Sequence, residues 1–157
     1  MEFVSEQVIN QIIDRSESGT AEQIAALGDQ QPVLLAYLVS EQFELLTPKE
    51  KDYFIYLAWI LHQSIYEQAS SPVSVNEASI GQAEEAIWEQ IEQGNKKDFR
   101  KMLDPFFEHT QQEDLLAFIE DSLVSDDEDF ITPSSRELMF VGLKTVMDVL
   151  TKHPNND

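Results

Sequence analysis

The sequence of 157 residues contains no cysteine, and this absence excludes a disulfide scaffold, thiol catalysis and metal sites built on thiolates. Glycine is scarce as well. The five glycines stand apart, so the chain has no P-loop, no dinucleotide fingerprint and no Gly-x-Ser-x-Gly elbow. No segment reaches the roughly 18 consecutive apolar residues of a membrane span. The sequence therefore gives no support to a nucleotide-binding enzyme, a serine hydrolase or a membrane protein.

Basic residues are few, with 10 Lys and Arg against 30 Asp and Glu, which gives a formal net charge of −20. Such a surface repels nucleic acid, because attraction to phosphate needs clustered cations. Residues 1–6 include two acids and lack the basic start and apolar stretch of a secretory signal. We therefore expect a cytoplasmic protein with no nucleic-acid partner and no membrane contact, and the missing cysteines suit that reducing compartment.

Helical periodicity is the main feature that the sequence does contain. Apolar residues make up 42% of the chain and recur at helical spacing, which predicts one all-α domain over residues 1–157. Start and stop residues divide it into about eight helices. The expected ranges are about 2–18, 20–28, 32–46, 48–69, 77–93, a sixth helix capped by Asn95 and broken or restarted at Pro105, 111–124 and 133–152.

The clearest helix start lies at Thr47-Pro48. Thr47 has the side chain of an N-cap, proline suits the first turn, and Glu50 completes a capping box. Thr132-Pro133 opens the last helix in a similar way.

The two halves of the sequence resemble each other, which indicates an internal duplication with units at about 2–69 and 77–152. Three pieces recur in the same order, at offsets of 75, 81 and 85 residues: Gly19-Thr20 as Gly94-Asn95, Leu34-Leu35-Ala36 as Leu115-Leu116-Ala117, and Thr47-Pro48 as Thr132-Pro133. The growing offset requires insertions near residues 105–110 and 126–129, where loops or a broken helix are expected. Chance is the plain alternative, because these short pieces are common in helices.

Two similar four-helix units can stack as a helical-hairpin array or pair about a pseudo-twofold axis as one bundle. The last offset pairs Leu57 with Gly142. A glycine inside an apolar helix needs a packing reason, so we expect another helix to approach closely at Gly142. We also expect the helices that begin at Pro48 and Pro133 to be the two most buried.

The three histidines, His62, His109 and His153, form no metal-binding pattern. None has a glutamate three residues before it, as di-iron carboxylate bundles require. His109 and Glu113 are four residues apart and would share a face only in a continuous helix. His62 follows the apolar run 53–61, where we expect a hydrogen-bonded, partly buried histidine. The sequence predicts neither a metal nor a cofactor.

Acidic residues offer two further candidates. The fifth helix carries four glutamates, for which a solvated face is expected, because a general acid needs burial beside apolar groups: Glu84, Glu85, Glu89 and Glu92. The acidic stretch Asp126–Asp129 lacks the glycine that an EF-hand needs at its sixth position. We therefore expect no catalytic acid and no calcium site at these positions.

Two clusters remain as possible contacts with other molecules. The basic residues Lys96, Lys97, Arg100 and Lys101 are candidates for binding an anion or a partner, with internal balance of the acidic surface as the alternative. Aromatic side chains surround the fourth helix, which is therefore central in the core or meets a partner or a second copy: Tyr53, Phe54, Tyr56 and Trp59.

The predicted function is a non-enzymatic protein–protein interaction module that presents a groove or an exposed apolar face. Helical-hairpin arrays usually serve binding, which is an argument from architecture alone. Two alternatives stay open: an acidic decoy that binds a basic nucleic-acid-binding protein by resembling a phosphate backbone, and an enzyme with carboxylates in a bundle cavity. A homodimer stays open as well.

Overall fold

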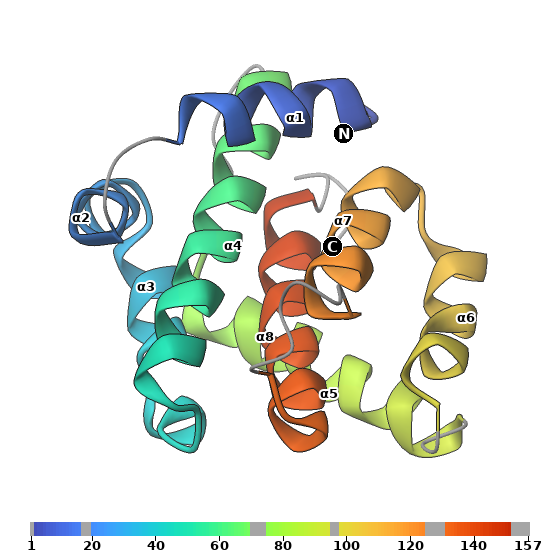
Figure 1. Ribbon diagram of the computed structural model, residues 1–157. Helices are drawn as coiled ribbons and strands as arrows, with labels where there is room; N and C mark the ends of the chain where they lie inside the picture. The colour runs from blue at the N-terminus through green and yellow to red at the C-terminus, as the bar shows by residue number, and fades with distance from the viewer. Residues whose placement is uncertain (1, 17–19, 70–74, 95–97, 125–130, 152–157) are drawn as a thin grey trace.

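The computed structural model describes residues 2–16, 20–69, 75–94, 98–124 and 131–151 (Figure 1). These residues form eight α-helices and one short 3-10 helix, with no strand among them, which confirms the expected all-α class. In chain order the elements are α1 (Glu6–Arg15), α2 (Thr20–Gln30), α3 (Pro32–Leu38), η1 (Glu41–Phe43), α4 (Pro48–Gln68), α5 (Glu77–Gln93), α6 (Phe99–His109), α7 (Glu113–Val124) and α8 (Pro133–Thr151).

The last helix, α8, lies at the centre of the molecule. Helices α4, α5 and α7 pack against it (Figure 1). Every residue from Met139 to Met147 is buried, so α8 contacts other helices on all of its sides. Helix α8 has twelve buried residues and α4 has ten, against at most four in any other helix of the described residues. The prediction that these two helices are the most buried is confirmed.

One buried carboxylate, that of Glu50, joins the N-terminal ends of α4 and α8. The Thr47 hydroxyl accepts from the Glu50 N–H (3.1 Å), and the Thr47 N–H donates to Glu50 Oε1 (2.9 Å), so the expected capping box is confirmed. Oε1 also accepts from the Ser135 hydroxyl (2.9 Å), and Oε2 from the Thr132 N–H (3.3 Å). Burial raises the pKa of Glu50, but these hydrogen bonds outweigh it and hold the pKa below its usual value.

The first helix begins at Glu6 rather than Glu2, because the residues before it are extended and bound to the start of α7. The side-chain amide of Gln112 accepts from the Val4 N–H (2.8 Å) and donates to the Glu2 carbonyl (2.9 Å). The Glu6 N–H, one of the donors that a helix leaves unpaired at its N-terminus, donates to Asp114 Oδ2 (2.8 Å). The boundary also has a local mark that the sequence analysis missed, because Ser5 is the N-cap and its hydroxyl accepts from the Val8 N–H (3.4 Å).

The break or restart predicted at Pro105 is wrong. Proline removes only one helical hydrogen bond, and α6 continues through it. Leu103 and Phe106 are buried on either side of the proline, and Asp98 caps the helix by accepting from two backbone N–H groups. This packing and capping offset the missing bond. Asn95, the predicted cap, lies outside the described residues.

Candidate functional site

The chain between α3 and α4 departs most from the predicted helices. We expected a helix up to Leu46, but α3 ends at Leu38. The Ser40 N–H and hydroxyl both donate to the Tyr37 carbonyl, at 3.1 and 2.6 Å, and this local bonding competes with continuation of the helix. The chain then turns through η1 before α4 begins. We call the part from Pro32 to Leu46 the α3–η1 segment.

The α3–η1 segment carries the two most exposed large apolar side chains among the described residues. Val39 follows the end of α3 and keeps 62% of its surface exposed, and Leu45 follows η1 and keeps 87% exposed. Between them in the sequence, the Phe43 ring is buried and packs on Phe54 of α4, with ring centroids 4.8 Å apart. The buried ring therefore holds the segment in place, while its neighbours in the chain present apolar surface to solvent.

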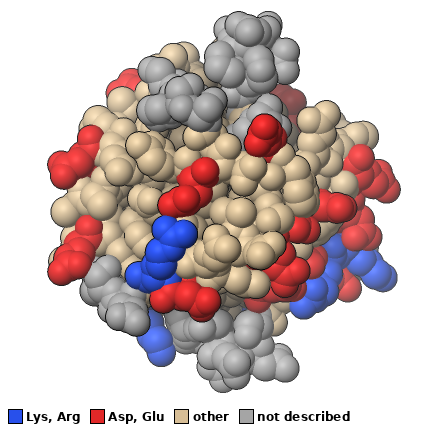
Figure 2. All heavy atoms as spheres, turned by 90° about the horizontal axis from the view of Figure 1, so that it is seen from above, with Lys and Arg blue, Asp and Glu red and all other residues tan. Residues whose placement is uncertain are grey.

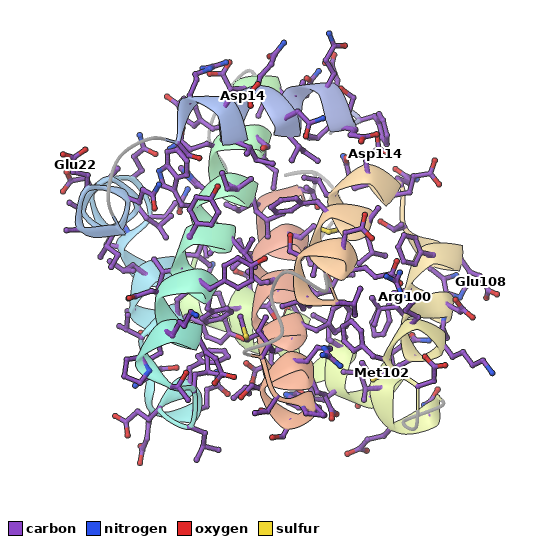
Figure 3. All side chains as sticks on the ribbon, viewed as in Figure 1. Asp14, Glu22, Arg100, Met102, Glu108 and Asp114 are labelled. Atoms are coloured by element: carbon purple, nitrogen blue, oxygen red, sulfur yellow. The ribbon has the colours of Figure 1, made fainter. Side chains whose placement is uncertain are left out.

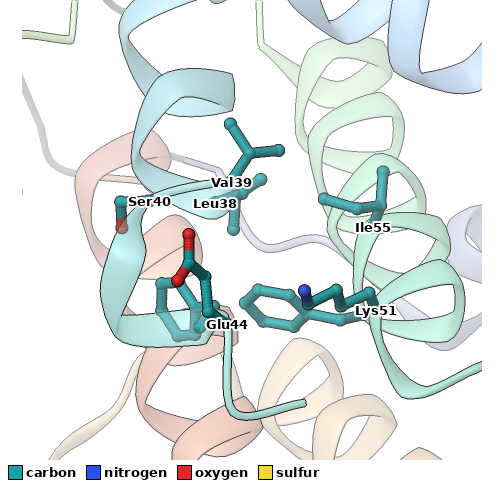
Figure 4. A pocket seen from close by; sticks show the side chains of 8 residues that line it. Leu38, Val39, Ser40, Glu44, Lys51 and Ile55 are labelled. Atoms are coloured by element: carbon teal, nitrogen blue, oxygen red, sulfur yellow. The ribbon is translucent and has the colours of Figure 1, made fainter. Parts of the chain in front are cut away.

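An apolar pocket opens between the α3–η1 segment and α4 (Figure 4). Its volume is about 160 Å³, close to that of an engineered cavity of about 150 Å³ that binds benzene. Glu44 and Lys51 extend beside its aromatic rings (Figure 4). The residues that line the apolar pocket are Leu38, Val39, Ser40, Phe43, Glu44, Lys51, Phe54 and Ile55.

A larger hollow of about 340 Å³ lies between the α3–η1 segment and α5, and we call it the acidic hollow. The α3–η1 segment contributes Val33, Ala36, Tyr37 and Gln42, and α5 contributes Glu77, Ile80, Gly81 and Glu84. The four residues of α5 follow a spacing of three and four, which places them on one face of the helix. Apart from its own helix backbone and its two chain neighbours, a Cβ atom added at Gly81 would have no atom within 4 Å, so the space above this residue is open.

Glu84 is the carboxylate that the acidic hollow fixes in place. Its Oε2 accepts from the Tyr37 hydroxyl (2.5 Å) and from the Gln42 side-chain amide (2.9 Å). Burial, and then the neighbouring Glu84 carboxylate, raise the pKa of Tyr37 far above its usual value, so the phenol keeps its proton and remains a donor. Both bonds end on Oε2, which orients the carboxylate and leaves Oε1 with no hydrogen bond from the described residues.

A third hollow, of about 180 Å³, lies between α5, α6 and α8 and contains an ion pair. Lys144, which is 8% exposed, donates to Asp148 Oδ1 at 2.5 Å, and its ammonium lies 5.8 Å from the centre of the Phe106 ring. Burial raises the pKa of Asp148, and the nearby Lys144 lowers it by less, so the net direction is upward. The two charges balance each other, which favours a satisfied ion pair over an activated lysine.

The predicted basic cluster lies only partly within the described residues, because Lys96 and Lys97 fall outside them. Arg100 belongs to α6 and its side chain extends toward α7 (Figure 3), where its Nη1 is 3.0 Å from Glu120 Oε1. Lys101 is exposed. For Arg100 this arrangement supports internal charge balance over binding of an external anion.

The other candidates predicted from the sequence are the glutamates of α5, the acidic stretch 126–129 and the pair His109 and Glu113, and those among them that the structure describes do not come together in one site. Glu85, Glu89 and Glu92 are exposed, as expected, whereas the structure brings Glu84 together with residues of the α3–η1 segment. The acidic stretch 126–129 lies outside the described residues. Helix α6 ends at His109 and α7 begins at Glu113, so this pair does not share one helix. No group of three or more His, Asp or Glu in the described part of the chain is placed to hold a metal ion.

The aromatic side chains around α4 belong to the core. Phe54 is buried, and three others are partly buried and pack against the core: Tyr53, Tyr56 and Trp59. Helix α4 is therefore a central helix, as one of the two interpretations of its sequence proposed.

His62 was expected to be hydrogen-bonded and partly buried, and the structure contradicts both parts of that expectation. The side chain is 3% exposed, and its Nδ1 has no hydrogen-bond partner in the described residues. The ring stacks on Tyr66, with centroids 6.1 Å apart. Burial lowers the pKa of His62 to about 4, so the imidazole is neutral near pH 7.

Acidic side chains lie apart over the left and centre of the face shown in Figure 2 and gather along its right-hand side. The few basic side chains on this face lie next to acids (Figure 2).

Comparisons with protein-family models, with curated proteins and with solved structures give no match for this chain. None of the helices in the described ranges is both long enough and apolar enough to span a bilayer. The features of the molecule that indicate a function are therefore the α3–η1 segment, the apolar pocket and the acidic hollow.

Proposed function

We propose that this chain is a non-enzymatic protein–protein interaction module of the cytoplasm, and that its docking site is the α3–η1 segment with the apolar pocket. The observation that carries the proposal is the exposure of Val39, which lines an open apolar pocket, and of Leu45, which follows the lining residue Glu44 in the chain. Exposed apolar surface next to a pocket is typical of a protein-binding site, since an apolar side chain of a partner can be buried there.

The occupant is a basic segment of another protein that carries one bulky apolar side chain. The apolar pocket, at about 160 Å³, suits a single large side chain. Two carboxylates, Glu77 and Glu84, lie in the neighbouring hollow, and the whole chain has a net charge of −20. Opposite charges steer association and suppress wrong partners, so a basic segment fits this surface better than an acidic one or a second copy of this chain.

The described side chains favour binding over catalysis. The charged pair in the third hollow, Lys144 and Asp148, is internally neutralised. The Glu84 carboxylate accepts hydrogen bonds from two neutral donors, Tyr37 and Gln42, and these bonds fix its orientation. These features support an interaction module over the bundle-cavity enzyme.

The duplication is a further proposal, for which the contact between α4 and α8 gives support. At the offset of 85, Glu50 corresponds to Ser135, and these two residues hydrogen-bond directly. Equivalent residues meet where a twofold axis between two similar units passes close to them. We therefore favour two units at about 2–69 and 77–152, related by a pseudo-twofold axis beside this contact, over a stacked array.

Selection of displayed random peptides against the wild-type chain, at about 0.15 M salt, tests the proposed function. We expect a consensus with one bulky apolar residue and nearby basic residues. We also expect the variant Leu45→Asp not to bind the selected peptides. Phe3→Asp is the matched control, because Phe3 is also an exposed apolar residue (44%) and lies near the N-terminus, away from α3 (Figure 1).

Three outcomes would contradict the proposal. The first is a selection without consensus. The second is a set of selected peptides that share only basic charge, still bind Leu45→Asp and no longer bind at about 0.5 M salt. This result would favour the acidic decoy. The third is a wild-type dimer in solution that Leu45→Asp dissociates, which would make a second copy the occupant.

A further inference from the structure

We infer that the acidic hollow is a receptor for one arginine side chain of the partner segment, with Glu84 as the carboxylate that binds the guanidinium. This inference rests on the proposed function, because it names the side chain that the docking segment must carry beside its apolar anchor.

The charged end of the acidic hollow is preorganised. The Tyr37 hydroxyl and the Gln42 amide both bind Glu84 Oε2, so the carboxylate is oriented before any ligand arrives. Its Oε1 accepts no hydrogen bond from the described residues and can accept from an incoming N–H. Preorganised acceptors lower the cost of binding, because fewer side chains lose freedom when the ligand is bound.

Part of the lining of the acidic hollow is apolar. Val33 and Ala36 of α3 and Ile80 and Gly81 of α5 all line it. The open space above Gly81 leaves room for the methylene stem of a long side chain. Arginine buries its stem on apolar surface while its charged head remains at a polar edge, so one side chain matches both the apolar lining and the carboxylate.

A second carboxylate favours arginine over lysine. Glu77 lies seven residues before Glu84 on the same face of α5 and also lines the acidic hollow. A guanidinium presents five N–H donors in a planar fork and can bind several acceptors at once, whereas an ammonium is a compact, strongly hydrated charge. The arrangement therefore distinguishes two cations of equal charge.

Titration of the isotope-labelled chain with n-butylguanidinium, followed by NMR, tests the acidic hollow without any peptide. We expect saturable shifts at the backbone amides of Ala36, Ile80 and Gly81, with a dissociation constant on the order of millimolar for so small a ligand. Butylammonium should bind several-fold more weakly, and binding of both should weaken as salt is added.

Two variants and one control make the titration specific. Glu84→Gln removes the charge and should weaken n-butylguanidinium binding about tenfold, whereas Glu85→Gln, a change of the same kind at an exposed position next in the chain, should leave it unchanged. Gly81→Leu fills the open space and should abolish binding without unfolding the chain. Shifts that scatter over the surface, or that persist in Glu84→Gln, would overturn the inference.

The peptide selection separates failure of this inference from failure of the proposed function. Peptides selected by wild type should be enriched in arginine at a fixed distance from the bulky apolar residue. Peptides selected by Glu84→Gln should still contain the bulky apolar residue but should not be enriched in arginine. Peptides selected by wild type that share the bulky apolar residue but contain no arginine would refute this inference and leave the proposed function standing. A selection that yields no consensus would refute the proposed function, and the titration would still decide whether the acidic hollow binds guanidinium.

Discussion

Gly142 in the centre of α8 lies directly against the ring of Phe54 on α4, and a Cβ atom at position 142 would overlap that ring. The same added atom would lie 3.0 Å from the ring of Phe43, the buried residue of η1. The close approach expected at Gly142 from the sequence is therefore confirmed. The contact also links the core to the proposed docking site, because both rings line the apolar pocket.

Gly142→Leu should destabilise the fold by about 1–3 kcal/mol, because the added side chain overpacks the contact between α4 and α8. Gly81→Leu is the matched control in another helix. It enters open space and replaces a residue of poor helix propensity, so it should raise stability by up to about 1 kcal/mol. Urea unfolding of the two variants measures both effects, and equal effects of the two substitutions would show that packing at position 142 is not tight.

Glu50→Ala should lower the free energy of unfolding by about 1–3 kcal/mol, because it leaves the buried Ser135 hydroxyl and the partly buried N–H groups of Thr47 and Thr132 without their acceptor. An exposed glutamate of α5, replaced in Glu85→Ala, should change stability by less than about 0.5 kcal/mol. The lowered pKa of Glu50 gives a second signature. Its stabilisation is present above the usual pKa of a glutamate and is lost as the pH falls through the folded value, a loss that Glu50→Ala should not show.

His62 should make the fold sensitive to mild acid. Its pKa is 6.5 in the unfolded chain and about 4 in the folded one, so the unfolded state binds the proton first as the pH falls. Between about pH 7.5 and 4 this difference removes about 3 kcal/mol of stability.

The variant His62→Leu isolates that effect. Other groups titrate in the same range, and the raised pKa of Asp148 acts in the opposite direction, but these contributions are common to both proteins. Thermal unfolding across this pH range should show a steeper loss of stability in wild type than in His62→Leu. Parallel curves would mean that His62 is hydrated or protonated in the fold.

The sequence predicted the parts of the fold that local patterns control. Thr47 and Glu50 formed the expected capping box, and Gly142 was placed in a close helix contact because a glycine in an apolar helix costs stability without one. The start of α1 was missed although Ser5 is a local N-cap, and Gln112, which holds the residues before the helix, is distant in sequence. Pro105 was overrated as a helix breaker, because burial and capping were not visible in the sequence.

The candidate site was not found from the sequence, for a similar reason. Apolar spacing predicted one helix through the α3–η1 segment, and this assigned Leu45 no special exposure. The bond that ends α3, from the Ser40 hydroxyl, is local but competes closely with a helical bond, so residue type alone does not decide the outcome. Glu84 could not be told apart from the glutamates next to it, because its partners Tyr37 and Gln42 come from another helix and turn.

The most direct test of the docking site is the affinity of the best selected peptide for three proteins, measured by fluorescence anisotropy: wild type, Leu45→Asp and Phe3→Asp. If the partner docks on the α3–η1 segment, Leu45→Asp should weaken binding at least tenfold, or by about 1.4 kcal/mol, while Phe3→Asp stays within twofold of wild type. Each variant adds the same charge at an exposed apolar position. A difference in peptide affinity between them therefore depends on the position of the substitution and not on its charge. Equal losses in the two variants, or none in either, would contradict a docking site on this segment.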